Sequence, residues 1–345
     1  MELIDIFPIR LKSARKIAGL SMDGLVEKIQ NIVSKAAIGK YEQGKMLPNS
    51  KILIALANGL NVSIDYFFRP LNYKLTNIEF RKKSKLPQNK QEQIKEKAID
   101  YLERYIEIED LLNKKTVFCN PLVNPKISDL PDIEKVAIEL RNVWNIGDAP
   151  IVNLLDLLED NGFKIIEVET TNDFDGLSAW VENIPIIVLN KNADILRKRF
   201  TALHEVAHLL LQFSETDNEK LCHSFAGAVL IPEHIIKKEL GNKRHSLALQ
   251  ELIAIKETFG ISVQALVMRA KSIEIVNDNF VKQFFIHIRA NHLQKEENLG
   301  NYSGVEHANR FNQLIYFAAT EEIISLSKAA NLAGEDLSNF RTQIN

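Results

Sequence analysis

The stretch that decides the fold is RKRFTALHEVAHLLL, residues 197–211. Its apolar residues recur with helical spacing and no Pro or Gly interrupts them, so the pattern predicts a buried amphipathic helix. On that helix His204 and His208 leave one face about one turn apart. Two such imidazoles can hold one metal ion, with Glu205 beside the metal-bound water. The alternative is a core helix whose two histidines are only hydrogen-bonded.

A catalytic zinc ion usually has three protein ligands and leaves its fourth position to water. The next helical pattern, residues 219–232, places Glu219 and His223 four positions apart on one face. Either of these side chains could therefore supply the third ligand. We expect Zn²⁺ in this site, with Mn²⁺ as the alternative ion.

Several blocks around these motifs resemble the ImmA/IrrE metallopeptidases, bacterial and phage proteins that act on helix-turn-helix repressors. The blocks are FDGLSAW (174–180), IPIIVLN (184–190), the lead into His204, and EKLCHSFAGAVLIP (219–232). In that family the glutamate of the last block is the third ligand, so the resemblance implies His204, His208 and Glu219 as the ligand set. It also implies an α+β, zincin-like peptidase domain.

Two positions depart from the family pattern, because Cys222 and His223 stand where Ala and Asn are usual. His223 is therefore a rival ligand, a transition-state donor, or a residue that supports the ligands. Cys222 is either a redox brake on the metal or a small buried residue. The donor that stabilises the oxyanion is not identified by the sequence, and the candidates are His223, His234, Arg199 and a tyrosine.

Residues 1–70 carry a different pattern, which predicts short helices at 10–18, 21–29, 34–43, 50–60 and 64–67. Their sequence resembles that of the Cro-like helix-turn-helix family of phage repressors, through Arg15, the Gly19-Leu20-Ser21 turn and the block SKAAIGKYEQGK (34–45). The resemblance implies that the helix after Ser34 enters the major groove of DNA. The contacts it implies involve Ser34 at a phosphate, Lys35 and Lys40, and thymine-methyl contacts from Ala36 or Ala37.

Charge divides the chain in the same way. Residues 1–70 hold 10 Lys or Arg against 6 Asp or Glu, residues 71–130 hold 12 against 9, and the remainder holds 21 against 30. A basic amino-terminal part is typical of a module that binds phosphate, joined here to an acidic body. A helical bundle that docks a protein instead of DNA remains the alternative.

Composition excludes other classes of protein. With 345 residues, 46% of them hydrophobic, the chain can build two or three domains with cores. No signal-like start and no membrane-length apolar run is present, so we expect a cytoplasmic protein with no membrane partner. The two cysteines, Cys119 and Cys222, are far apart in sequence, which argues against a disulfide framework.

A polar break at 82–91 precedes a helix with an apolar stripe spaced alternately four and three residues apart. The stripe indicates either a connector helix packed on its own chain or a seam for a homodimer. Helices at 131–143 and 149–161 and strands at 163–168 and 184–189 are expected next. Apolar residues after 276 indicate further helices, which we expect to form a solvated appendage. The stripe consists of Ile94, Ala98, Tyr101, Tyr105, Ile108 and Leu112.

The predicted architecture is multidomain: an all-α helix-turn-helix bundle (1–70), a basic linker and connector helix (71–130), a peptidase domain (131–275) and a helical C-terminal region (276–345). The predicted function is a DNA-binding regulator that hydrolyses a repressor protein, in trans or within its own exposed segments 82–91 or 113–129. The double-stranded operator and the protein substrate are the expected partners. The alternative is a transcription factor or antitoxin whose peptidase-like domain is an inactive sensor.

Overall fold

The computed structural model describes residues 3–70, 86–123, 125–171, 173–214, 218–293 and 298–344. The chain forms two compact units, which are described separately below. Of the described residues, unit 1 holds 3–70, 86–115 and 310–344, and unit 2 holds those within 116–309. The predicted multidomain, mostly helical fold with a small α/β region is confirmed. None of the described helices combines the length and apolar character needed to cross a bilayer.

Unit 1 begins with a small helical bundle. Buried apolar side chains from each helix form one core, which includes Leu11, Leu25, Ile38 and Leu56. Serine and asparagine side chains cap the second, third and fourth helices by accepting a backbone N–H of the first turn. The first helix starts earlier than predicted and continues through Pro8, because Phe7, Leu11 and Ala14 bury one continuous stripe. The elements are α1 (Leu3–Ile17), α2 (Met22–Lys28), α3 (Lys35–Glu42), α4 (Ser50–Leu60) and the 3₁₀ helix η1 (Ile64–Phe68).

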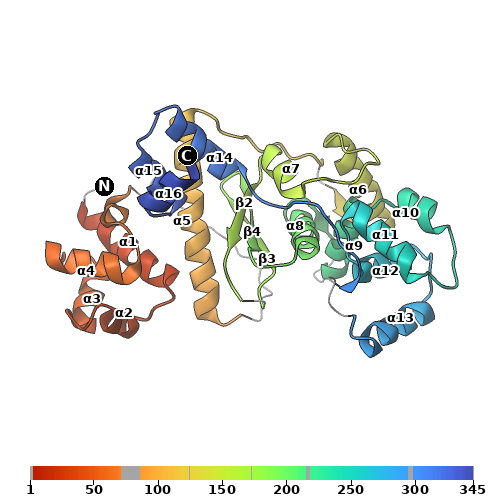
Figure 1. Ribbon diagram of the computed structural model, residues 1–345, viewed down its shortest axis with the longest axis horizontal. Helices are drawn as coiled ribbons and strands as arrows, with labels where there is room; N and C mark the ends of the chain where they lie inside the picture. Colours follow the sequence, from red (N-terminus) through yellow and green to blue (C-terminus); the bar gives the residue numbers. More distant parts are fainter. Residues whose placement is uncertain are drawn as a thin grey trace. The chain divides into compact units, whose positions relative to one another are not determined.

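The predicted connector helix is α5 (Gln88–Leu112), and it is packed on its own chain within unit 1 (Figure 1). Residues 93–103 of α5 lie against α1, where Arg10 donates to Glu103 and Gln93 donates to the carbonyl of Ile17. Arg69 joins this network through Asp100 and Glu103. These buried charges are paired, as burial requires, so α5 is bound to the bundle by specific contacts.

The second half of α5 is covered by the C-terminal helices α14 (Arg310–Thr320), α15 (Leu326–Ala333) and α16 (Leu337–Ile344). Tyr105 and Ile108 of the apolar stripe share one core with Phe311, Leu332 and Phe340. The expectation of a solvated C-terminal appendage is therefore wrong for α14 to α16. A local apolar pattern could not reveal their partner, because that partner lies about 200 residues earlier in the chain.

Unit 2 is built around a three-stranded sheet with the order β2–β4–β3. β2 (Lys164–Val168) pairs in parallel with β4 (Ile184–Asn190), and β3 (Gly176–Val181) pairs antiparallel with β4. The helix α8 (Ile195–Leu210) lies beside β3 and β4 and packs on α9 (Glu219–Leu230) (Figure 1). β1 (Lys126–Ile127) and β5 (Gln212–Phe213) form a second short parallel pair.

Further helices complete the large core of unit 2. α6 packs on α9, the helix that begins at Glu219, and so helps to hold it in place. The segment predicted as one C-terminal region is divided, since α13 belongs to unit 2 and α14 to α16 belong to unit 1. The remaining helices are α6 (Leu130–Val143), α7 (Leu154–Asp160), α10 (Glu233–Leu240), α11 (Leu249–Phe259), α12 (Val263–Ser272) and α13 (Asp278–Ala290).

Candidate metal centre

The α8 helix presents the HExxH residues from a buried platform. Asp194 caps its start by accepting the N–H of Leu196, and the helix then runs uninterrupted to Leu210. Leu203, Val206 and Ala207 are fully buried in the core of unit 2. Because this face of α8 is fixed in the core, the orientation of the opposite face is fixed as well. His204 and His208 therefore project from the helix in the same direction.

Three side chains of the ligand type meet at this point. His204 Nε2 lies 3.1 Å from His208 Nε2 and 3.4 Å from a carboxylate oxygen of Glu219, and His208 Nε2 lies 3.7 Å from the other oxygen. For tetrahedral ligands at the usual Zn–N and Zn–O distances, neighbouring ligand atoms are about 3.3–3.5 Å apart. The three side chains therefore fit around one divalent ion. Glu219 reaches this position because it opens α9, which packs on α8.

The chemical state of His204 also fits a ligand. Burial, together with smaller effects of the neighbouring His223 and His208, lowers the pKa of His204 to about 3. The ring is therefore neutral near pH 7, which is the form that binds metal. His208 is oriented from behind, because Cys222 Sγ lies 3.6 Å from its Nδ1. Cys222 is fully buried, whereas Cys119 is exposed.

His223 lies next to the triangle formed by His204, His208 and Glu219. The ligand atoms of His204, Glu219 and His223 lie within 4.8 Å of one another. That spread is wider than the triangle made with His208, so His223 fits a neighbour of the ion better than a ligand. Its ring is 4.5 Å from the ring of His204 and stacks on Phe200 at 5.8 Å between centroids.

Glu205 points from α8 toward the sheet. It is 8% exposed and accepts a hydrogen bond of 2.6 Å from the hydroxyl of Ser178 on β3. Burial raises the pKa of Glu205 to about 7, the hydrogen bond from Ser178 opposes the increase, and the charge of Glu219 adds to it. Sequence reasoning missed this contact. The block containing Ser178 was noticed, but only the tertiary packing of β3 on α8 pairs the two residues.

Two of the candidate oxyanion donors are engaged elsewhere. Arg199 is fully buried in an ion pair with Glu306 and donates to the carbonyl oxygens of Gly260 and Ile151. His234 lies 2.7 Å from a carboxylate oxygen of Asp148 at the surface. Among the candidates named by number, only His223 lies within the cluster.

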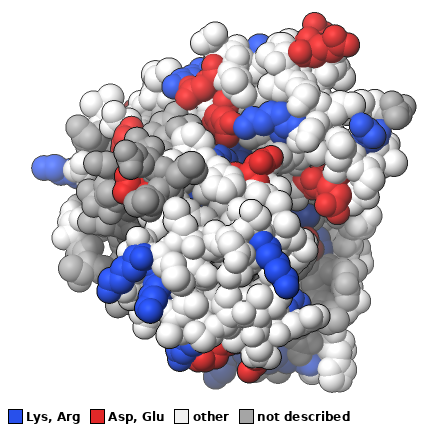
Figure 2. Space-filling view, turned by 90° about the vertical axis from the view of Figure 1, so that its left-hand side faces the viewer, with Lys and Arg blue, Asp and Glu red and all other residues white. Residues whose placement is uncertain are grey.

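The residues expected to read DNA lie on or next to α3. Ser34 caps α3 by accepting the N–H of Ala37, and this bond leaves its own O–H able to donate to a phosphate. Lys35, Ala36 and Lys40 are exposed, and Lys35 pairs with Asp23 at 2.6 Å. Ala37 is half-buried against the bundle core. Figure 2, which faces the side of Figure 1 where the bundle lies, shows scattered basic and acidic side chains among uncharged ones.

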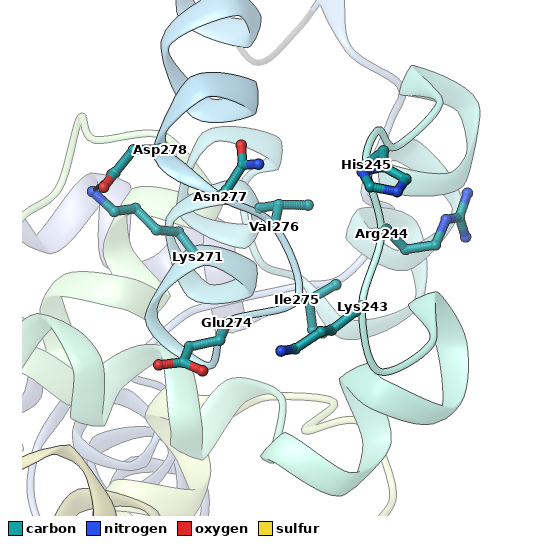
Figure 3. A pocket seen from close by; sticks show the side chains of 9 residues that line it. All are labelled: Lys243, Arg244, His245, Lys271, Glu274, Ile275, Val276, Asn277 and Asp278. Carbon is teal, nitrogen blue, oxygen red and sulfur yellow. Dashed lines mark ion pairs between the residues drawn. The ribbon is translucent and has the colours of Figure 1, made fainter.

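A separate pocket of about 450 Å³ lies in unit 2 between the loop 243–245 and residues 271–278 (Figure 3). Its lining is mixed in charge, and two of its cations already have acidic partners: Lys271 pairs with Asp278, and Arg244 pairs with Glu251. The pocket is distinct from the candidate metal centre, because its lining includes none of His204, His208, Glu219 and His223.

Comparison with protein families agrees with this division. A model of the IrrE N-terminal-like domain, a peptidase family, matches residues 159–271, and a helix-turn-helix model matches residues 11–67. The first range contains the sheet, α8 and α9, and the second contains α2 to α4. No curated protein and no solved structure matches the chain significantly. The chain therefore joins an N-terminal helix-turn-helix domain to a domain of the IrrE N-terminal-like peptidase family.

Proposed function

We propose that this protein is a DNA-binding transcription regulator whose second domain is a zinc-dependent endopeptidase. The observation that carries the proposal is the triangle of His204, His208 and Glu219, whose atoms are separated by 3.1–3.7 Å. Glu205 lies beside it on the same helix. In this proposal the first three residues hold the ion and Glu205 is the general base.

A divalent ion held there supplies Lewis-acid chemistry to peptide hydrolysis. Glu205 takes a proton from the attacking water and transfers it to the leaving amine. Its buried carboxylate suits both steps, because its pKa of about 7 lies close to the working pH. We assign His223 the role of a donor to the developing oxyanion, since its ring adjoins that of His204.

The sheet favours an extended peptide as the substrate. β3 is an edge of the sheet, and no strand among the described residues pairs with its outer side. An extended chain can add to such an edge through main-chain hydrogen bonds. Because β3 packs on α8, a peptide bound there would pass close to Glu205.

We propose a helix-turn-helix repressor as the protein substrate, with this chain itself as one candidate. Of the two self-cleavage segments, 82–85 lie outside the described residues, and Leu86 is buried just before α5 begins. Segment 113–129 is the better candidate, because it has little regular structure and Val117 and Val123 are 79% and 90% exposed. Packed helices resist cutting and exposed loops do not.

One cut in 113–129 would not by itself free the DNA-binding domain. Unit 1 contains both the bundle with α5 and the C-terminal helices α14 to α16, which continue directly from unit 2. The two fragments would stay joined through the core that Tyr105 and Ile108 share with Phe311 and Phe340. Release would need a second event that loosens this core.

The test is incubation of zinc-loaded protein, alone and with purified helix-turn-helix repressors, followed by mass spectrometry of new termini. We expect new termini that depend on Glu205, with Glu205→Gln as the matched inactive control. Cleavage that persists in Glu205→Gln would contradict the assigned base. Zinc binding without any cleavage, across the repressors and the intact chain, would favour the sensor alternative.

A further inference from the structure

The β3 strand approaches α8 unusually closely at Gly176. A Cβ atom added to Gly176 would lie 2.6 Å from Cγ2 of Thr201, closer than such atoms come in real proteins. With any other residue at this position, either the Thr201 side chain or the β3 strand would have to shift. Glycine is therefore the residue that allows strand and helix to meet at this point.

The spacing along the two elements then brings a second pair together. Two residues along a strand advance about 6.7 Å and return to the same face, and four residues along a helix advance about 6 Å. Starting from Gly176 and Thr201, the next matched pair is Ser178 and Glu205. The structure has this pair, with Ser178 Oγ 2.6 Å from Glu205 Oε2.

The hydrogen bond is enclosed. Ser178 is 4% exposed and Glu205 is 8% exposed, so bulk water has little access to the contact. A glutamate side chain has several rotatable bonds, and without a fixed partner it samples several positions. A hydroxyl bound to Oε2 fixes the carboxylate plane and therefore the direction of the other oxygen. Hydrogen bonds to an ionised group are also stronger than neutral ones.

We propose that Ser178 is the positioning residue of Glu205, and that Gly176 allows it to reach the carboxylate. This inference rests on the proposed function, in which Glu205 is the general base. β3 thus offers its edge to the peptide and also holds Glu205 through Ser178, so one strand positions both the substrate and the base. Loss of Ser178 should therefore slow the chemical step while leaving substrate binding and metal binding unchanged.

The test compares Ser178→Ala, Ser178→Cys and Ser178→Thr with Ser128→Ala. Because Ser128 lies in the candidate segment 113–129, cleavage is measured on a separate repressor; there Ser128→Ala is the matched control, since its hydroxyl contacts Ser214 at the surface of the same unit. We expect Ala and Cys to lower kcat by about 10- to 100-fold with KM and zinc content unchanged, since misplacing a catalytic group costs on that order. Thr keeps the hydroxyl and should retain most of the rate. Cys keeps the volume but is a weak donor, so it separates packing from hydrogen bonding.

A measurement without activity tests the same contact. In the metal-free protein, Ser178→Ala and Glu205→Ala together should lower the melting temperature by less than the sum of their separate effects, because each substitution removes the same hydrogen bond. Additive shifts, or an unchanged kcat in Ser178→Cys, would overturn the positioning role. If the zinc-loaded native protein cleaves neither a repressor nor itself, the proposed function fails, while the melting-temperature cycle still reports on the Ser178–Glu205 contact.

Discussion

Glu306→Gln is the perturbation whose size the structure defines most clearly. Arg199 of α8 and Glu306 form an ion pair in which both side chains are fully buried. Glu306 also accepts the N–H groups of Leu154 and Leu155 at the start of α7, at 2.9 and 3.1 Å. The substitution keeps the shape but leaves the guanidinium buried without its opposite charge. Breaking a buried pair in this way costs about 3–5 kcal/mol.

For a domain of this size each kcal/mol lowers the melting temperature by about 2–4 °C, so we expect a decrease of roughly 6–20 °C. The assay is calorimetry or circular dichroism of the full chain. The matched control is Asp175→Asn, which breaks a pair made by Arg197 on the same helix at 2.5 and 2.7 Å. That pair is half-exposed, and exposed pairs contribute about 0–1 kcal/mol. Equal shifts for the two variants would refute the reasoning.

Three further predictions concern unit 1. Lys35→Ala with Lys40→Ala should weaken DNA binding and reduce the slope of log affinity against log salt by about 2, measured by fluorescence anisotropy, whereas exposed Lys282→Ala in α13 should not; an unchanged slope would favour a protein-docking bundle. Phe340→Ala should cost about 3–5 kcal/mol, because the ring is fully buried. When the chain is nicked at an engineered site within 113–129, the two fragments should elute together on size exclusion if Phe340 is native and separately in the Phe340→Ala variant. Co-elution of both fragments in the variant would contradict the shared core. Burial alone would raise the pKa of Asp100, but the charges of Arg104 and Arg69 outweigh it and hold the pKa below its usual value. The stability of unit 1 should therefore decrease more steeply as the pH falls below about 4. Asp100→Asn should flatten that pH dependence.

Local sequence patterns predicted the elements that carry their own signals. The apolar spacing around His204 and His208 predicted α8, and the capping serines predicted the starts of α2 and α3. The short strands β1 and β5 carry no such signal, because two residues cannot show alternation. The true start of α1 was obscured by Pro8, which the helix tolerates within a buried face.

Contacts between distant segments were beyond the sequence. Glu219 was assigned through a family resemblance, and its approach to His204 depends on how α9 packs on α8. Ser178 could be paired with Glu205 only after β3 and α8 were placed together, since 27 positions separate the two residues. The packing of α14 to α16 on α5 could not be predicted for the same reason, because the apolar face of each helix has no visible partner in the local sequence.

Metal content tests the central claim most directly. Elemental analysis of zinc-reconstituted protein should give about one zinc ion per chain, retained in Glu205→Gln and in the surface control His234→Ala. His204→Ala, His208→Ala and Glu219→Gln should each lose most of the zinc, because each removes one corner of the triangle. A full equivalent of zinc in His204→Ala would contradict the assigned metal centre.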